Sequence, residues 1–248
     1  MTVVFADCTY RYKRGNRPVL TDFSYEISPG TTILLGPNGA GKSTALKLAA
    51  SLAKPQRGHV SFNGMRSTAR EYRRQVSWMP QHITAAPGLT CREQVAYTGW
   101  LKGMNRSDAW SGAEHALAKV NMLEQAQKKA TKLSGGQLRR LGVAAALVHD
   151  CQVLLLDEPT AGMDPTQRRV FREVVSSVAE GGLRVLMSTH DVADLAEDAD
   201  QVTVLADGVI RYHGDAPGFL AEAPSGVTAA RMAEAAYSKI VHGIGSGL

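Results

Sequence analysis

One short segment constrains the fold more than any other, because Gly36-Pro-Asn-Gly-Ala-Gly-Lys-Ser43 fits the pattern GxxxxGK[ST]. An apolar run, residues 32–35, precedes it and a helical pattern follows, which is the strand, loop and helix context that the pattern requires. The glycines let the backbone curl around phosphates, so that successive N–H groups and the helix N-terminus face them. We therefore expect Lys42 to reach the β- and γ-phosphates of a nucleotide and the Ser43 hydroxyl to be placed for Mg²⁺.

A second apolar run ends in two adjacent carboxylates. Residues 153–156 are typical of a buried strand, and Asp157 and Glu158 follow it directly. Because side chains alternate along a strand, the two carboxylates point in different directions and can do different work. We assign Asp157 to the magnesium shell and Glu158 to polarising an attacking water. The alternative is a solvated strand end, which is the weaker interpretation beside a phosphate loop.

Apolar runs rich in β-forming residues recur along the chain, with helical patterns between most of them. They cover residues 32–35, 76–79, 153–156 and 185–188, and this rhythm predicts a parallel sheet covered on both faces. The sheet is expected to end in a hairpin, because Asp207-Gly208 lies between the apolar runs 202–206 and 209–213.

Helix signals dominate residues from about 86 to 145, where two helix-start signatures occur, Thr90-Cys-Arg-Glu93 and Ser134-Gly-Gly-Gln137. We expect an inserted helical subdomain there. A further helix is expected to begin after Asp164-Pro165 and to stop at Gly181-Gly182. The end of the chain, from about residue 221, is expected to form one amphipathic helix over residues 229–241, to which we assign no function.

Composition argues against several classes of protein. Cys8, Cys91 and Cys151 are scattered and lack CxxC spacing, so we expect buried thiols rather than disulfides or a zinc site. No apolar stretch approaches the roughly 20 residues needed to cross a bilayer, and we expect the protein to stay in the cytosol. A net charge of +5 would suit nucleic acid or anionic lipid, but the basic residues do not cluster along the sequence, which favours a solvated surface.

The segment Leu133-Ser-Gly-Gly-Gln137 has a local explanation, since Ser134 can cap a helix and Gln137 can complete the capping box. Two glycines at a capped helix start also leave a bare N-terminus that can accept a phosphate. With the phosphate loop before it, and residues 153–159, residues 161–165 and His190 after it, the order resembles that of the ATP-binding-cassette (ABC) ATPases. The resemblance covers roughly residues 3–215, and LSGGQ is nearly diagnostic of that family.

The resemblance implies an α/β fold, a P-loop NTPase core with a mostly parallel sheet, a small antiparallel β subdomain and an inserted α-helical subdomain. Residues 1–220 would form the ABC ATPase domain, with the helical subdomain at about 86–145, and residues 221–248 would form a C-terminal helical tail. The resemblance also implies ATP and Mg²⁺ as cofactors, and a head-to-tail dimer of this chain with itself or with a paralogue.

The family's site residues carry over by matching segments. Ser134 and Gly136 would contact the γ-phosphate of ATP held by the other subunit's phosphate loop. Gln81 is similar to the glutamine that contacts magnesium and water and senses the transporter partner, and His190 to the switch histidine that contacts the γ-phosphate. The nucleotide-binding residues so implied are Tyr12, Gly36, Pro37, Asn38, Gly39, Ala40, Gly41, Lys42, Ser43, Thr44, Ser134, Gly135, Gly136, Gln137 and Asp164. The implied catalytic set is Glu158, His190, Lys42 and Gln81, and the implied magnesium contacts are Ser43, Gln81 and Asp157.

Two of these positions have competing interpretations. Tyr12 sits where the family places an aromatic ring on adenine, but Tyr10 is close enough to compete. Asp164 resembles the aspartate that couples the two sites across the dimer, and it can also be a helix N-cap. Ala161 and Met163 stand where Ser and Leu are usual, and both changes are sterically mild.

The function expected from this resemblance is ATP hydrolysis that drives transport through an integral-membrane subunit on another polypeptide. The chain would be cytoplasmic and peripheral on the inner face of the cell membrane. Residues 89–104 and the compact tail look more like exporters of drugs, peptides or lipids than like amino-acid importers. The alternative is a soluble ABC ATPase that acts on nucleic acid or ribosomes. One short helical insert between Lys42 and Ser134, and a single cassette, favour transport, and no nucleic acid partner is expected.

Overall fold

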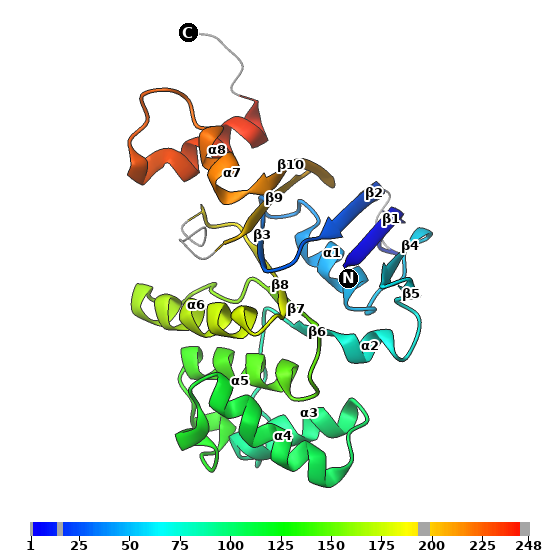
Figure 1. Ribbon diagram of the computed structural model, residues 1–248, viewed down its shortest axis with the longest axis vertical. Helices are drawn as coiled ribbons and strands as arrows, with labels where there is room; N and C mark the ends of the chain where they lie inside the picture. Colours follow the sequence, from blue (N-terminus) through cyan, green and yellow to red (C-terminus); the bar gives the residue numbers. More distant parts are fainter. Residues whose placement is uncertain (1, 14–16, 193–198, 244–248) are drawn as a thin grey trace.

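Residues 2–13, 17–192 and 199–243 are described by the computed structural model, and they form two sheets with helices around them (Figure 1). The larger sheet has six strands in the order β10-β9-β3-β8-β7-β6. All neighbouring strands pair in parallel except β9 and β10. The parallel sheet expected from the apolar runs is therefore confirmed. The strands are β3 (Thr31–Leu35), β6 (Val76–Met79), β7 (Val153–Asp157), β8 (Arg184–Thr189), β9 (Gln201–Ala206) and β10 (Val209–Asp215).

The smaller sheet is antiparallel and has the strand order β2-β1-β4-β5. Its strands are β1 (Val3–Tyr10), β2 (Leu20–Ile27), β4 (Arg57–Phe62) and β5 (Met65–Arg66). The helix α1 (Lys42–Ala49) lies beside this sheet, and the short helix α2 (Tyr72–Gln75) connects it toward β6 (Figure 1). The Tyr72 hydroxyl donates to the carbonyl oxygen of Ala49 at 2.6 Å, which ties α2 to the end of α1.

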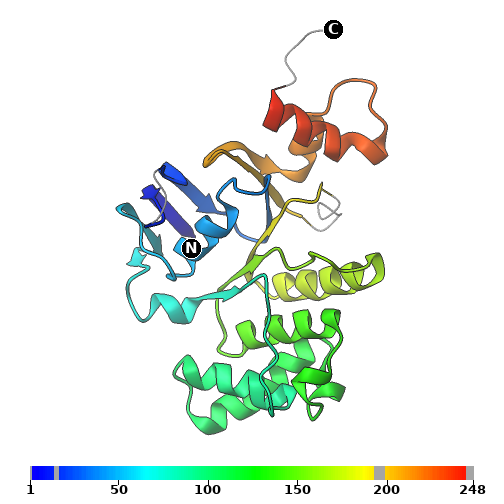
Figure 2. The same ribbon diagram turned by 180° about the vertical axis from the view of Figure 1, so that it is seen from behind.

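The helical insert contains α3 (Cys91–Leu101), α4 (Arg106–Lys119) and α5 (Gly135–Leu147). These three helices form a layer at one end of the molecule, and α6 (Pro165–Glu180) runs alongside α5 (Figures 1 and 2). Both expected capping boxes are present, Thr90 with Glu93 before α3 and Ser134 with Gln137 before α5. The fold class expected from the sequence is confirmed, including the inserted helices and the small antiparallel sheet.

The central strands are apolar on both sides because both faces of the sheet are covered. Every residue of β3 and β7 is buried. Alternate side chains of β3 enter two separate cores. Ile33 and Leu35 pack in a core with Leu141 of α5, whereas Leu34 packs in a second core with Leu46 of α1. The period of two along the strand thus decides which layer each side chain supports.

The expected hairpin joins β9 to β10. Asp207 and Gly208 have φ of 51° and 74°, and two positive values are what a two-residue turn of type I′ needs. The strands pair in antiparallel fashion from Ala206 and Val209 onward, so the Asp-Gly signal is confirmed.

The end of the chain differs from the expected single helix over residues 229–241. The α-helix α8 (Met232–His242) begins later, because residues Ala229–Arg231 form a 3-10 turn before it. A preceding helix, α7 (Ala216–Ala221), starts at the Asp215 cap, and Phe219 of α7 and Ala236 of α8 are fully buried. Both helices lie at the opposite end of the molecule from α3, α4 and α5 (Figures 1 and 2).

Other features of the described residues agree with the composition. Cys8, Cys91 and Cys151 are free thiols and all three are buried, as expected. In the described parts of the chain, no helix combines the length and the apolar character that crossing a bilayer demands.

Two glycines of the smaller sheet allow a direct test of its packing. Gly58 and Gly64 have φ of +72° and +76°; a Cβ on Gly58 would lie 2.2 Å from the carbonyl oxygen of Ala6, whereas a Cβ on Gly64 would meet nothing within 4 Å. We predict that Gly64→Ala lowers the free energy of unfolding by about 1 kcal/mol, the cost of the left-handed backbone alone. Gly58→Ala should cost about 2 kcal/mol more, because the β1 backbone must move. Urea unfolding measures the free energy of unfolding of both variants. Equal decreases in that free energy would contradict the close approach of β4 to β1.

Candidate nucleotide-binding and hydrolysis site

The phosphate loop joins β3 to α1 at the carboxyl end of the parallel sheet. Gly39 and Gly41 have φ of 85° and 108°, values that other residues rarely adopt, so the loop turns where this sequence supplies glycine. Lys42 is 4% exposed, and its Nζ donates to the carbonyl oxygen of Gly36 at 2.6 Å. Burial lowers the pKa of Lys42, and the carboxylate of Glu158 acts against that shift. A buried amine inside a loop of this shape is suited to binding polyphosphate.

Asp157 ends β7 and lies next to the phosphate loop. It is 4% exposed, and its Oδ1 accepts hydrogen bonds from the hydroxyls of Ser43 and Ser188, each at 2.9 Å. Hydroxyl and carboxylate oxygens are ligands that Mg²⁺ prefers, and this ion usually takes only one or two protein carboxylates, with water and phosphate oxygens completing its shell. No group of three or more His, Cys, Asp and Glu side chains among the described residues could hold a metal ion. The Ser43 and Asp157 pair therefore fits Mg²⁺ that arrives with a nucleotide.

At Glu158 the backbone leaves the extended conformation of β7, the strand that positions Asp157. The φ of Glu158 is 45°, and its backbone N–H donates to both the carbonyl oxygen and the hydroxyl of Ser188, each at 3.1 Å. The carboxylate lies 3.5 Å from Lys42 Nζ, 3.2 Å from Gln81 Nε2 and 3.3 Å from His190 Nδ1. The structure thus brings together the four side chains that the sequence analysis placed in the catalytic set.

Tyr12 lies beside the start of α1, which follows the phosphate loop. Its hydroxyl is 3.1 Å from the Thr44 hydroxyl on α1, and its side chain is 41% exposed. The Tyr10 ring packs edge-on against it, with ring centroids 5.1 Å apart, and is less exposed. An exposed aromatic face beside the loop suits stacking on a planar base, which favours Tyr12 over Tyr10 for that role.

The signature residues Ser134, Gly135, Gly136 and Gln137 begin α5 in the helical layer. Ser134 Oγ accepts from the Gln137 backbone N–H at 3.3 Å, and Gln137 Oε1 accepts from the Ser134 N–H at 3.1 Å. Ser134 and Gly135 are exposed, and a Cβ on Gly135 would meet nothing within 4 Å. Over the described ranges, no hydrogen bond or ion pair joins these residues to the phosphate loop of the same chain. The capped helix start therefore faces outward.

Asp164 lies next to this helix start, at the beginning of α6. Its Oδ1 accepts from the backbone N–H of Gln167 at 2.9 Å, so it is the N-cap of α6. The Gln167 side chain in turn covers Gly136, where a Cβ would lie 2.0 Å from Gln167 Oε1. The N-cap interpretation of Asp164 is thus seen directly, and a role across a dimer stays a prediction.

Two residues of the site were not identified from the sequence. The Ser188 hydroxyl bonds both the Asp157 carboxylate and the backbone of Glu158. The strand register could have identified it, because Ser188 lies opposite Asp157 in the pairing of β7 with β8. Arg139, on α5, donates to the carbonyl oxygens of Gln81 and Ala161. The sequence pattern that could have identified Arg139 is a charged residue between Leu138 and Leu141, on a helix that packs into the core.

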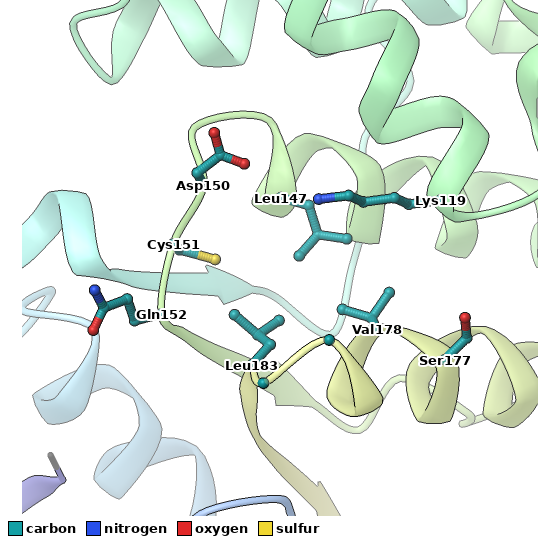
Figure 3. Close-up of a pocket in the computed structure, with 10 residues that line it drawn as sticks. Lys119, Leu147, Asp150, Cys151, Gln152, Ser177, Val178 and Leu183 are labelled. Carbon is teal, nitrogen blue, oxygen red and sulfur yellow. The ribbon is translucent and has the colours of Figure 1, made fainter.

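A cavity of about 350 Å³ lies near the start of β7, at the end of the sheet opposite the phosphate loop (Figure 3). The side chains of Leu147, Val178 and Leu183 point toward one another within it (Figure 3). Cys151 and Gln152, which also line it, precede β7, whereas Asp157 ends that strand. This cavity is therefore separate from the site built around the phosphate loop.

A strand that ends in a phosphate loop, a buried Lys, a Ser and Asp pair for Mg²⁺ and a carboxylate held by three side chains define a P-loop nucleotide hydrolase. The family model for "ABC transporter" matches residues 20–161. The phosphonates import ATP-binding protein PhnC 1 of Rhodopseudomonas palustris is 36% identical over an alignment of 225 residues, and the match covers 84% of this chain and 80% of that protein. The Nod factor export ATP-binding protein I of Burkholderia lata is 36% identical over 197 residues, 78% of this chain and 65% of that protein.

A solved structure agrees with these sequence matches. It is a dimeric ABC cassette in a post-hydrolysis state bound to ADP and Pi, with a TM-score of 0.75, 26% identity and coverage of 86% of this chain and 98% of that one. The chain belongs to the ABC transporter family, and it is an ATPase cassette of that family, as the LSGGQ segment indicated. It spans slightly less than two thirds of the length of the Nod factor export protein.

The position of Glu158 predicts its effect on turnover. Glu158→Gln should lower the ATP turnover rate by on the order of 10² or more, because one preorganised group in the transition state is lost. Nucleotide binding should survive, since the phosphate loop and Ser43 are unchanged. Steady-state phosphate release and the Kd of a fluorescent ATP analogue measure the two effects. A normal turnover rate in the variant would rule out the assignment of Glu158.

Proposed function

We propose that the chain is the ATP-binding and ATP-hydrolysing subunit of an ABC transporter, and that ATP is held between two such subunits in a head-to-tail dimer. The observation that carries this proposal is the separation of two phosphate-binding elements within one chain. The phosphate loop is lined by Lys42, while the capped N-terminus at Ser134 is exposed and, among the described residues, is joined to that loop by no hydrogen bond or ion pair. The dimeric ABC cassette with ADP and Pi supports a site shared in this way.

Hydrolysis in this proposal needs positioning and charge rather than a covalent intermediate. Lys42 binds the β- and γ-phosphates, and Ser43 with Asp157 would hold Mg²⁺, which when bound neutralises charge on the phosphate oxygens. Glu158 orients the attacking water in line with the γ-phosphate, and Gln81 and His190, which both contact its carboxylate, keep that carboxylate in place. Ser134 and Gly136 of the other subunit complete the contacts to the γ-phosphate.

Opening and closing of the dimer follow from where the γ-phosphate lies. ATP contacts both subunits, so it favours the closed dimer by the contacts it gains there. Hydrolysis removes the γ-phosphate from the position where Ser134, Gly136 and His190 meet it, and the closed form loses that stabilisation. The cycle can then move a partner docked on the helical layer.

The helical layer carries features that support a membrane partner on another polypeptide. Along a cavity of about 800 Å³, α3 and α4 expose the aromatic side chains Tyr97, Trp100 and Trp110, which are 51%, 57% and 42% exposed. Exposed apolar groups gathered in one place mark interaction sites on many proteins. In this proposal the subunit works in the cytoplasm, peripheral on the inner face of the membrane, where the partner lies.

The direction of transport is a finer part of the proposal. We prefer export of a drug, peptide or lipid, because residues 89–104 look more like those of exporters. Relatives named for import and for export are equally similar, at 36% identity each, so family membership alone carries no preference. No finding favours the alternative of action on nucleic acid or ribosomes.

A shared site predicts that blocking the signature stops hydrolysis without blocking binding. Ser134→Arg should lower turnover by on the order of 10² or more, because a long cationic side chain fills the place of the γ-phosphate contact from the other subunit. The Kd of the isolated chain for nucleotide should stay unchanged. Thr131→Arg, which adds the same charge at an exposed position before α5, is the matched control. Unchanged hydrolysis in Ser134→Arg would show that the signature takes no part in the site.

A shared site also predicts a dependence on protein concentration. If the chain pairs with itself, ATPase activity per molecule should rise with concentration and then level off, because the active species is a dimer formed by mass action. The activity of Glu158→Gln should be lower by on the order of 10² or more at every concentration. An activity per molecule that is substantial and independent of concentration down to the nanomolar range would count against the dimeric site.

A further inference from the structure

One side of α5 contacts three separate segments of the site. Gly136, Arg139 and Gly142 follow one another at a spacing of three residues, which places them on the same side of a helix. A Cβ on Gly136 would lie 2.0 Å from Gln167 of α6, and a Cβ on Gly142 would lie 2.8 Å from Ile83. The helix that begins with the signature therefore packs closely against both α6 and the segment that follows Gln81.

Arg139 lies between these two close contacts. Its Nη1 donates to the carbonyl oxygen of Gln81, and its Nη2 donates to the carbonyl oxygen of Ala161 at 3.4 Å. The side chain is half-buried and forms no ion pair with any described residue. Its charge is thus met by two backbone carbonyl groups that belong to different loops.

Both loops carry residues of the hydrolytic site. The Gln81 side chain donates to the carboxylate of Glu158 at 3.2 Å. Ala161 follows Glu158 closely in the chain and precedes Asp164, the N-cap of α6. Arg139 is the one side chain on α5 whose hydrogen bonds, over the described ranges, reach both of these loops.

We infer that Arg139 is a positioning residue for hydrolysis, which ties the Gln81 loop (residues 80–84) to the Ala161 loop (residues 159–164) and makes both follow the signature helix. A movement of α5, which carries Ser134, then moves the side-chain amide of Gln81 that contacts Glu158. The proposed membrane partner would act on the helical layer and change water activation through this link. The inference rests on the proposed function for that last step alone.

The chemistry of arginine suits this position. A guanidinium is a planar fork whose two terminal nitrogens can donate to two acceptors at once, whereas the lysine ammonium is a single point charge on a flexible stem. Arg139→Lys should therefore keep the charge but hold one carbonyl oxygen at a time. The conservative variant separates the geometry of the link from its charge.

Arg140 provides a matched control on the same helix. It is also half-buried, and its Nη1 donates to the carbonyl oxygens of Val120 at 3.4 Å and Asn121 at 3.1 Å, within the helical layer. Arg140→Ala, like Arg139→Ala, removes a guanidinium that donates to backbone carbonyl oxygens. Its effects should appear near residues 120–121 rather than in the two loops.

Hydrogen exchange of the full chain tests the link without relying on activity. Arg139→Ala should speed exchange of backbone amides in both the Gln81 loop and the Ala161 loop by on the order of tenfold, the scale of losing a hydrogen bond from a charged donor. Arg139→Lys should show a smaller increase. Arg140→Ala should leave both loops as in the unchanged protein. An increase in only one loop, or an equal increase in Arg140→Ala, would overturn the inference.

Kinetics separates positioning from general destabilisation. Arg139→Ala should lower kcat about tenfold while the Kd for nucleotide stays unchanged, because the phosphate loop is not touched. Millimolar guanidinium ion should restore part of the lost activity in Arg139→Ala and none in Glu158→Gln. If exchange changes as expected but Glu158→Gln turns over normally, the proposed catalytic assignment fails while the link stands. If exchange does not change, the link fails whatever the activity.

Discussion

The parallel pairing of β3, β8 and β7 is the constraint on which the site depends. In a parallel sheet the carboxyl ends of neighbouring strands lie at one edge, so the phosphate loop after β3, His190 after β8 and the two carboxylates at the end of β7 meet without any long-range adjustment. The register then decides the details. Ser188 stands opposite Asp157, and from that position its hydroxyl holds the Asp157 carboxylate and the Glu158 backbone together.

Capping links local stability to chemistry in the helical layer. Ser134 satisfies a backbone N–H at the start of α5, which is a reason for a serine there that involves no ligand. The capped helix start is also exposed, and a Cβ on Gly135 would meet nothing within 4 Å. A residue that stabilises its own helix can therefore also present that helix to a phosphate, and the two explanations weighed for the LSGGQ segment are compatible.

Local signals predicted the parts of this fold that depend on a few neighbouring residues. The phosphate loop, the Asp207-Gly208 turn and the two capping boxes each follow from short-range backbone chemistry, and the structure contains all of them. Contacts between distant segments left weaker traces. Nothing local to Arg139 indicates that its partners are the carbonyl groups of Gln81 and Ala161, because those partners are set by how α5 packs. The start of α8 was misplaced because a 3-10 turn, which is frequent at the ends of α-helices, precedes it.

The separation of apolar side chains into two cores bears on how chains of this kind diverge. Ile33 and Leu35 support the helical layer, whereas Leu34 supports α1 and the antiparallel sheet. The first core also contains buried residues of α3 and α4, whereas the second contains Leu46 and Leu48 of α1, the helix that follows the phosphate loop. The surface of the helical layer can therefore vary while the core around α1 stays the same, and relatives named for import and for export are equally similar to this chain, at 36% identity each.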